Sequence, residues 1–389
     1  MRILLVTSEY PPNVWGGLGR YCAEVVRTLR DQAEVDVLCI PSYSNQYVPA
    51  RLRENSLGQS EEGGVRVLQQ MDTPRGEDPL DGHGGNPSAL DAELRGWLRS
   101  PYDVLFAQDY FIAPLVAELF LSSSVARVVS FSHLPLYAGF SYFNRPGTAD
   151  RQQALEAKLF RVSHRVLVPS DFARQVILQS YGLHPDTVVV VPEGVRPSPP
   201  SLRKHRPSGG PIRLLSVARM TQQKGVEYMV DLADELFTRG LDFAYTIVGD
   251  GPMEPYLAAR IGRAPSQHLI RHVRRAEPKR DVFREYADHD LLVSASLYET
   301  FGLVLLEAMA SGCVPVAFRV TAVEEILTPA EGVLVSVGDL GAMADAIIGL
   351  AQDHERRSAL ALAGKGTAQS LSWDAHAARL MSVFGGEDD

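Results

Sequence analysis

Short runs of β-branched and other apolar residues alternate with segments of helical periodicity along nearly the whole chain. In the first half this pattern predicts helices most clearly at 18–30, 111–121, 151–161 and 171–181. It predicts strands at 2–8, 35–40, 65–70, 103–108, 127–133, 165–170 and 187–192. Apolar strands that alternate with helices are typical of a parallel sheet covered on both faces, so we expect a doubly wound α/β domain.

The alternation breaks between 196 and 211, where the sequence reads RPSPPSLRKHRPSGGP and cannot continue a helix or a central strand. A second series follows, with strands expected at 212–217, 243–248, 269–273, 291–294, 314–317 and 333–335, and helices around 226–239, 252–261, 279–287, 302–310 and 340–351. We therefore expect two Rossmann-like domains, 1–195 and 212–370, joined by the linker 196–211 and facing each other across a cleft. Residues 371–389 are expected to form a helix that returns to the first domain.

Composition and charge narrow the class of protein. A length of 389 residues suits two domains, and 45% hydrophobic with 22% charged residues indicates a globular chain. The formal charge of -9 argues against a nucleic-acid binder that relies on electrostatics. The first 150 residues contain no lysine, so they lack a polybasic stretch for anionic lipid, and we expect no strong membrane association. Their negative charge would suit a cationic acceptor.

The three cysteines, Cys22, Cys39 and Cys313, form neither a Cys-x-x-Cys pair nor a zinc spacing, which suits a reducing compartment. The opening apolar run is too short for a signal-peptide core, and no later stretch is long enough to span a membrane. We therefore expect a cytoplasmic protein. The polar stretch 72–91, rich in Gly and Pro, is predicted to be a surface loop, either a mobile insertion or a segment that closes over an acceptor.

The most informative segment runs from 296 to 316, where a strand ends, a turn follows and a helix begins. Glu299 lies before this helix and Glu307 inside it. The N–H groups of Phe301, Gly302 and Leu303 lie between them, and with the helix dipole they would form a site for an anion such as a diphosphate. One carboxylate could then accept from sugar hydroxyls and the other from a ribose. The alternative is that both acids only stabilise the helix dipole.

Glu299 and Glu307 form a Glu-x7-Glu signature, and three further motifs accompany it: GGLGR at 16–20, SVARMTQQKG at 216–225 and IVGDGP at 247–252. With these motifs nearly the whole chain resembles the group-1 retaining glycosyltransferases with the glycosyltransferase-B fold. The resemblance implies a retaining enzyme that needs no metal, with Arg219 and Lys224 on the donor diphosphate. It also implies that Gly249 belongs to the donor site.

Two cations beside a diphosphate would stabilise the leaving group as charge develops on it. Arg219 and Lys224 follow the first strand of the second domain, where doubly wound folds bind ligands. The alternative is that both are solvated residues after a strand, without a ligand. Gly16 and Gly17 would let a main-chain N–H approach the phosphate or the sugar. Cys22 stands where a dinucleotide-binding fingerprint would need its third glycine, so a nicotinamide oxidoreductase is disfavoured.

On the acceptor side, the resemblance places a histidine facing the donor sugar or the acceptor at His133, which would orient a hydroxyl or share the acceptor proton; the alternative is a packed structural histidine. Asp109 is a candidate for an acceptor hydroxyl or amine, and Tyr137 a further acceptor contact. Phe106-Ala107-Gln108 stands where many relatives carry a histidine pair, which puts acceptor contacts inferred from relatives in doubt. Glu193 replaces the commoner Asn and adds a carboxylate whose role is open.

Asp288-His289-Asp290 looks like a metal-binding Asp-x-Asp motif, but its position before a buried strand predicts a turn at a helix end. We therefore predict no metal site and no cofactor beside the nucleotide sugar as co-substrate.

Together these features predict a retaining, metal-independent hexosyltransferase that moves a sugar from a nucleotide diphosphate sugar to a hydroxyl of a small soluble acceptor. A UDP-sugar is weakly favoured as donor, and an aminocyclitol or other secondary metabolite, in carbohydrate or antibiotic biosynthesis, as acceptor. The alternatives are a glycosyltransferase for a lipid or polysaccharide precursor, a sugar-nucleotide epimerase, and a sensor that binds a sugar nucleotide without turnover. The oligomeric state is left open.

Overall fold

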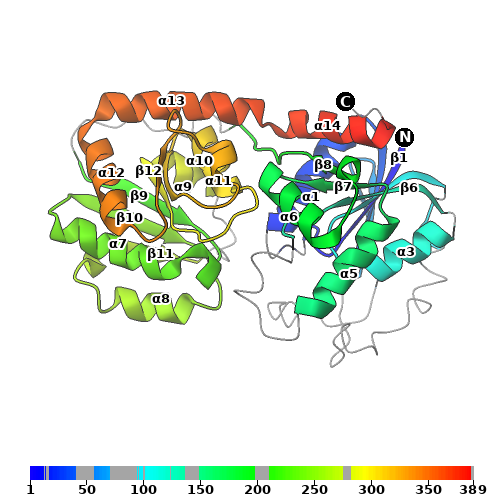
Figure 1. Ribbon diagram of the computed structural model, residues 1–389, viewed down its shortest axis with the longest axis horizontal. Helices are drawn as coiled ribbons and strands as arrows, with labels where there is room; N and C mark the ends of the chain where they lie inside the picture. The colour runs from blue at the N-terminus through cyan, green and yellow to red at the C-terminus, as the bar shows by residue number, and fades with distance from the viewer. Residues whose placement is uncertain are drawn as a thin grey trace. The chain divides into compact units, whose positions relative to one another are not determined.

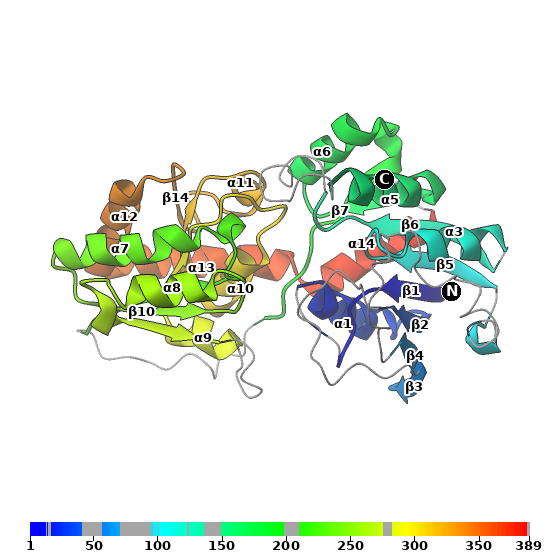
Figure 2. The same ribbon diagram turned by 90° about the horizontal axis from the view of Figure 1, so that it is seen from below.

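The computed structural model describes residues 1–12, 14, 17–40, 57–70, 94, 96–99, 101–122, 124–135, 149–197, 210–274 and 282–386. The chain divides into two compact units, each built on its own sheet (Figures 1 and 2). Unit 1 comprises Met1–Val191 together with Ala377–Asp389, and unit 2 comprises Pro192–His376.

Unit 1 contains a sheet with the strand order β3-β4-β2-β1-β5-β6-β7-β8 in its described part. All neighbours pair in parallel except β3 and β4, which are antiparallel. The strands are β1 (Arg2–Thr7), β2 (Glu34–Cys39), β3 (Leu57–Glu62), β4 (Val65–Gln70), β5 (Tyr102–Ala107), β6 (Val125–Phe131), β7 (Arg165–Val168) and β8 (Val188–Val190). The helices include α1 (Gly17–Leu29), α3 (Ala113–Leu121), α5 (Ala149–Val162), α6 (Asp171–Tyr181) and most of α14 (Trp373–Gly385).

The apolar sequence of β1 explains why this strand is central. Its residues from Ile3 to Thr7 are all buried, and the register places Ile3 beside Val35 on one side and Val104 on the other. A strand without an exposed face requires cover on both sides of the sheet, which helices supply in doubly wound folds. The predicted doubly wound α/β class is therefore confirmed for unit 1.

The antiparallel strand β3 is absent from the sequence-based prediction. Its sequence, LGQSEE, carries no apolar alternation. The two residues that join it to β4, Gly63 and Gly64, have φ values of 58° and 81°. Two positive φ values suit a tight hairpin whose twist matches that of its strands, so the Gly-Gly pair was the available signal.

Unit 2 contains a parallel sheet with the order β11-β10-β9-β12-β13-β14 in its described part. The strands are β9 (Ile212–Val217), β10 (Phe243–Val248), β11 (Ile270–Val273), β12 (Leu291–Ser294), β13 (Val314–Phe318) and β14 (Val333–Val335). The helices are α7 (Val226–Thr238), α8 (Glu254–Ile261), α9 (Val282–Asp288), α10 (Leu303–Ser311), α11 (Val323–Ile326), α12 (Leu340–Gln352) and α13 (His354–Ser370).

In both sheets the strand order reverses once near the middle. The chain builds outward from β1 toward β2 and β4 and then resumes with β5 on the other side of β1. In unit 2 it builds outward from β9 toward β10 and β11 and resumes with β12. Because right-handed crossovers on either side of such a point place helices on opposite faces, a crevice forms outside the carboxyl ends of these two strands. The reversals between β1 and β5 and between β9 and β12 are therefore the first places to search for ligand sites.

Helix α13 was also not predicted, because its polar sequence with two glycines lacks a strong apolar face. It begins where the Asp353 carboxylate accepts a hydrogen bond from the N–H of Arg356, at 2.8 Å. It packs against α10, and at this contact a Cβ on Gly364 would lie 3.0 Å from the Met309 side chain. The helix is therefore stabilised by its cap and by tertiary packing.

The chain passes between the units twice, after Val191 and after His376. Within unit 2 the two crossing segments lie side by side: Val195 donates its N–H to the Leu371 carbonyl at 2.9 Å, and His376 Nδ1 lies 2.7 Å from the Pro192 carbonyl. The last part of α14 packs in unit 1, where the Phe384 ring contacts Phe106. No helix in the described part of the chain is long and apolar enough to cross a membrane.

Candidate active site

In unit 2 the structure brings Lys224 and Glu299 together at the reversal between β9 and β12. Lys224 Nζ lies 2.6 Å from Glu299 Oε1, and the two side chains are 22% and 10% exposed. Gly225, with a φ of 61°, makes this approach possible, because a Cβ there would overlap the Ala295 carbonyl at the end of β12. The turn after β9 therefore packs directly on the turn after β12.

A small, partly open pocket lies at the same place, at the carboxyl ends of β9 and β12. Its walls include Lys224 and three small residues, Ser216, Ala295 and Ser296. Such a site, at a sheet's reversal and with an ammonium group in its wall, suits an anionic ligand.

The main chain of Glu299 is fixed from two sides. On one side the Leu297 N–H donates to the Gln223 carbonyl at 2.8 Å, and Gln223 Nε2 donates to the Tyr298 carbonyl at 3.1 Å. On the other side the Thr321 hydroxyl accepts from the Glu299 N–H at 2.9 Å and donates to the Glu299 carbonyl. The carboxylate, in contrast, meets the side chain of Lys224.

Helix α10 begins at Leu303, so of the two acids only Glu307 lies in a helix and the span from Glu299 to Gly302 is a turn. Gly302 forms the N-cap with a φ of 102°. The first N–H groups of a helix have no partner within it and can bind an anion. Phe301 is only 4% exposed, so its side chain belongs to the core, and any contact to a ligand would come from its main chain.

Glu307 is held by Tyr286, whose hydroxyl donates to Glu307 Oε2 at 2.8 Å. Tyr286 belongs to α9 and is fully buried, so this hydrogen bond fixes the carboxylate from inside the unit. Sequence reasoning missed Tyr286 and Thr321, because each lies more than 20 residues from the acid it contacts. No local pattern could have linked them.

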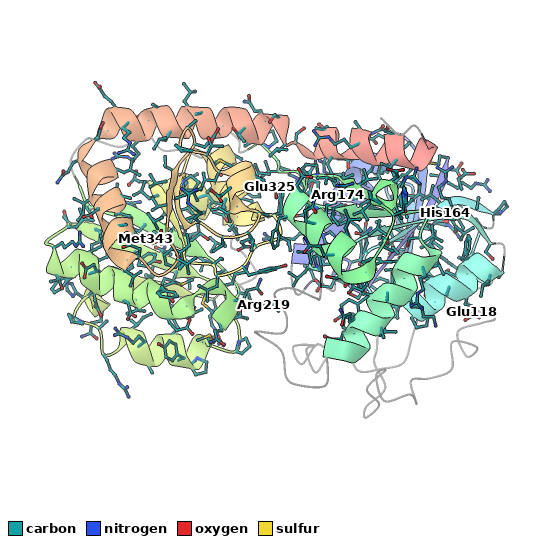
Figure 3. All side chains as sticks on the ribbon, in the orientation of Figure 1. Glu118, His164, Arg174, Arg219, Glu325 and Met343 are labelled. Atoms are coloured by element: carbon teal, nitrogen blue, oxygen red, sulfur yellow. The ribbon has the colours of Figure 1, made fainter. Side chains whose placement is uncertain are left out.

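Arg219 lies in the turn after β9 and is exposed (Figure 3). Gly249, with a φ of 148°, follows β10 and packs so closely on this turn that a Cβ would overlap the Ala218 carbonyl. The Met220 N–H also donates to the Asp250 carbonyl at 2.8 Å. The glycine therefore shapes the loop that carries Arg219, and its contact with the donor stays a prediction.

In unit 1, His133 follows β6 and is held as part of an aromatic cluster. Its ring stacks on Phe131 with centroids 4.4 Å apart and meets the edge of Tyr21. Its Nε2 lies 3.2 Å from Gln108 Oε1. Gln108 is 1% exposed, and its Nε2 has no hydrogen-bond partner among the described residues. The histidine is thus oriented at the carboxyl end of the sheet.

Asp109 lies at the reversal between β1 and β5, and both of its carboxylate oxygens are occupied by the main chain. Oδ2 accepts from the Ser8 N–H at 3.1 Å, and Oδ1 accepts from the Phe111 N–H at 2.9 Å. Burial raises the pKa of Asp109, while these hydrogen bonds act in the opposite direction. The side chain ties the end of β5 to the end of β1, and acceptor binding by Asp109 stays a prediction.

Gly17 begins α1, and nothing lies within 4 Å of a Cβ placed on it. Gly16, Tyr137 and the loop 72–91 lie outside the described residues. Glu193 is buried, 6% exposed, beside the first crossing between the units.

Asp288 is the last residue of α9, and His289 and Asp290 follow the helix, which agrees with the predicted turn at a helix end. His289 is buried, with Nδ1 2.6 Å from the Glu285 carbonyl and Nε2 3.0 Å from Thr246 Oγ1. Within the described ranges no group of three or more His, Cys, Asp or Glu side chains is arranged to hold a metal ion.

Comparison with known proteins agrees with this arrangement. The family model described as "Glycosyl transferases group 1" matches residues 211–353, and "Glycosyltransferase Family 4" matches residues 15–198. Glycogen synthase of Mycobacterium tuberculosis is 27% identical over 91% of this chain and 86% of its own length. Alpha-maltose-1-phosphate synthase of Mycolicibacterium smegmatis is 24% identical over 99% of both chains. The structure of HepE from Anabaena with UDP-glucose superposes with a TM-score of 0.74 at 17% identity, covering 99% of this chain and 100% of that one.

The chain is a glycosyltransferase with the glycosyltransferase-B fold, and the group 1 and family 4 models each match one part of it. It is a transferase that depends on a nucleotide sugar, so the resemblance inferred from the motifs is confirmed. Transferase activity argues against two of the alternatives, the sugar-nucleotide epimerase and the sensor that binds a sugar nucleotide without turnover.

Proposed function

We propose that this enzyme transfers a hexose, with retention of configuration and without a metal ion, from a UDP-sugar to a hydroxyl of a small soluble acceptor. The observation that carries the proposal is the Lys224–Glu299 pair in the turns after β9 and β12, beside the start of α10. It combines a cation, free helix N–H groups and a carboxylate, which are the groups that a diphosphate and a sugar need.

In this proposal Lys224, Arg219 and the N–H groups of Phe301, Gly302 and Leu303 bind the diphosphate. They neutralise the charge that develops on the leaving phosphate, which is the task a metal ion performs in other enzymes. Glu299 accepts hydrogen bonds from hydroxyls of the transferred sugar. Glu307, held by Tyr286, accepts from the ribose.

The chemical step breaks the bond between the anomeric carbon and the phosphate oxygen. The acceptor oxygen bonds to the same carbon on the same face, and the acceptor proton passes to the leaving diphosphate. No protein nucleophile is needed for this front-face course. His133, oriented by Gln108 and Phe131, would hydrogen-bond the sugar or the acceptor on the unit 1 side.

The donor base is tested by binding of UDP, GDP, ADP and dTDP in a thermal-shift panel. A nucleotide present at about 100 times its Kd adds about 2.7 kcal/mol of stability, which is readily measured. We expect UDP to give the largest shift, and the structural likeness to HepE with UDP-glucose supports this choice. A larger shift with another nucleotide would reassign the base, and no shift with any would overturn the donor site.

The identity of the acceptor is tested once the donor nucleotide is known. Alpha-maltose-1-phosphate synthase is named for a small soluble product, whereas glycogen synthase favours a second candidate, a polysaccharide acceptor. Glucose 1-phosphate, 2-deoxystreptamine and glycogen would each be incubated with UDP-glucose and the products identified by mass. A product with either small acceptor supports the proposal, and a product with glycogen alone supports the second candidate.

Two further measurements test the mechanism. The anomeric configuration of the product, determined by NMR, tests retention, and unchanged turnover in the presence of EDTA tests metal independence.

A further inference from the structure

Thr321 has a main-chain conformation that threonine rarely adopts. Its φ is 37°, and among the residues that the structure describes it is the only one other than glycine with a positive φ. A β-branched side chain is strongly disfavoured in this left-handed region, where glycine fits without penalty. A residue held in such a conformation is fixed by its surroundings, and residues of this kind cluster at binding and active sites.

The contacts of the Thr321 hydroxyl give a reason for threonine at this position. The hydroxyl accepts from the Glu299 N–H at 2.9 Å and donates to the Glu299 carbonyl. A hydroxyl has one donor and two acceptor positions, so this one group satisfies both main-chain polar groups of Glu299. The Ala322 N–H adds a longer hydrogen bond, 3.4 Å, to the same carbonyl. A glycine would relieve the conformation but could make neither hydroxyl contact.

The turn that carries Glu299 depends on this contact. It leaves the sheet after β12 and is tied by Gln223 at Leu297 and Tyr298, before Glu299 itself. Beyond Glu299 the chain enters α10 through Gly302, a residue with a wide choice of conformations. The Thr321 segment leads directly into α11, whose Glu325 is labelled in Figure 3, and it meets the turn through the Thr321 hydroxyl and the Ala322 N–H.

We propose that Thr321 is a positioning residue for Glu299: its hydroxyl fixes the Glu299 main chain so that the carboxylate is held where the sugar hydroxyls bind. This inference rests on the proposed function, in which Glu299 contacts the transferred sugar. Thr321 itself would not touch the substrate. Its effect would therefore fall on turnover of the donor sugar and leave binding of the nucleotide diphosphate unchanged.

The test compares Thr321→Gly, Thr321→Val and Thr321→Ser with Glu299→Gln. Glycine removes both the strained conformation and the hydroxyl, valine removes only the hydroxyl, and serine keeps it. Thr238→Val is the matched control, because Thr238 donates its hydroxyl to the Asp234 carbonyl at the end of α7, away from the turn. The measurements are kcat and KM for release of nucleotide from UDP-, GDP-, ADP- and dTDP-glucose, with each of the three acceptors named above present to receive the glucosyl group. Kd for the matching nucleotide is measured as well, and unfolding in urea shows that each variant folds.

We expect kcat to fall about tenfold or more in Thr321→Gly and Thr321→Val, because small misplacements of a substrate-contacting group are costly. Thr321→Ser and Thr238→Val should stay near the wild type, and Kd for the nucleotide should not change in any Thr321 variant. If Thr321→Gly turns over like the wild type while Glu299→Gln is impaired, the positioning role is overturned and the proposed function stands. If Glu299→Gln is itself unimpaired, or the wild type turns over none of the four donors, the proposed function falls and the inference with it.

Discussion

Two carboxylates occupy equivalent places in the two units and are used in opposite ways. Asp109 lies at the reversal of strand order between β1 and β5, and Glu299 lies at the reversal between β9 and β12. Both oxygens of Asp109 accept main-chain N–H groups, so the side chain holds the fold together. In Glu299 the Thr321 hydroxyl holds the main chain, and the carboxylate contacts the side-chain ammonium of Lys224.

The comparison shows that a place at the carboxyl ends of the strands does not by itself define a ligand-binding residue. A carboxylate whose oxygens both accept main-chain N–H groups is held in place by the fold. A carboxylate on an anchored main chain, paired with a side-chain ammonium, can exchange that partner for sugar hydroxyls while the ammonium turns to a phosphate. We expect the predictions below to separate the two residues.

The largest expected effect is on turnover in Glu299→Gln. The amide keeps the shape but weakens hydrogen bonds with sugar hydroxyls that strengthen in the transition state, so we expect kcat to fall about 100- to 1,000-fold. The Kd for the nucleotide diphosphate should change little. Steady-state kinetics and calorimetry measure the two quantities, and Glu325→Gln, on the exposed part of α11, is the control. A drop in nucleotide affinity equal to the drop in turnover would contradict a role at the sugar.

Lys224→Met should weaken binding of the nucleotide itself. A charge-assisted hydrogen bond contributes about 1.5–3 kcal/mol, so Kd for UDP should rise about 10- to 100-fold. Lys158→Met, at an exposed position of α5 in unit 1, should leave Kd unchanged. Titration calorimetry measures both Kd values, and an unchanged Kd for Lys224→Met would contradict a role of this lysine in binding the diphosphate.

Asp109→Asn should act on stability. The amide offers one acceptor oxygen to two N–H groups and turns its own N–H donors toward the other, so the free energy of unfolding should fall by about 1–3 kcal/mol. Asp103→Asn is the matched control, because its exposed carboxylate accepts one N–H, from Arg2. Urea unfolding measures both. Loss of activity in Asp109→Asn without loss of stability would instead support the predicted acceptor role.

The smallest expected effect is the change in the pH dependence of stability in His289→Gln. Like the oxygens of Asp109, both ring nitrogens of His289 contact groups of their own unit. Burial lowers its pKa, so the unfolded chain takes up the proton first as the pH falls. Its contribution to stability should be complete above about pH 6.5 and decline below it, by at most about 1.4 kcal/mol per pH unit. His289→Gln should flatten this slope in urea unfolding, whereas the exposed His184→Gln should not. An unchanged slope in His289→Gln would show that other groups set it.

Most strands and helices could be predicted from the sequence, because an apolar run such as that of β1 directly indicates a buried strand. The position of Glu299 and of Lys224 after strands of the second domain could also be predicted, from the motifs at the strand ends. Contacts between distant segments could not be predicted in this way. Thr321 reaches Glu299 across 22 residues, and nothing in the sequence around Asp109 shows that main-chain N–H groups occupy its oxygens. Helix α13 likewise depends on packing against α10.

The most direct test of the account is a crystal structure of the enzyme with a UDP-sugar analogue that cannot be transferred. The account predicts the diphosphate at the N-terminus of α10 within hydrogen-bond distance of Lys224, and sugar hydroxyls on the Glu299 carboxylate. Asp109 should keep its bonds to Ser8 and Phe111. A diphosphate bound away from the start of α10, or a sugar that contacts Asp109 and not Glu299, would contradict it.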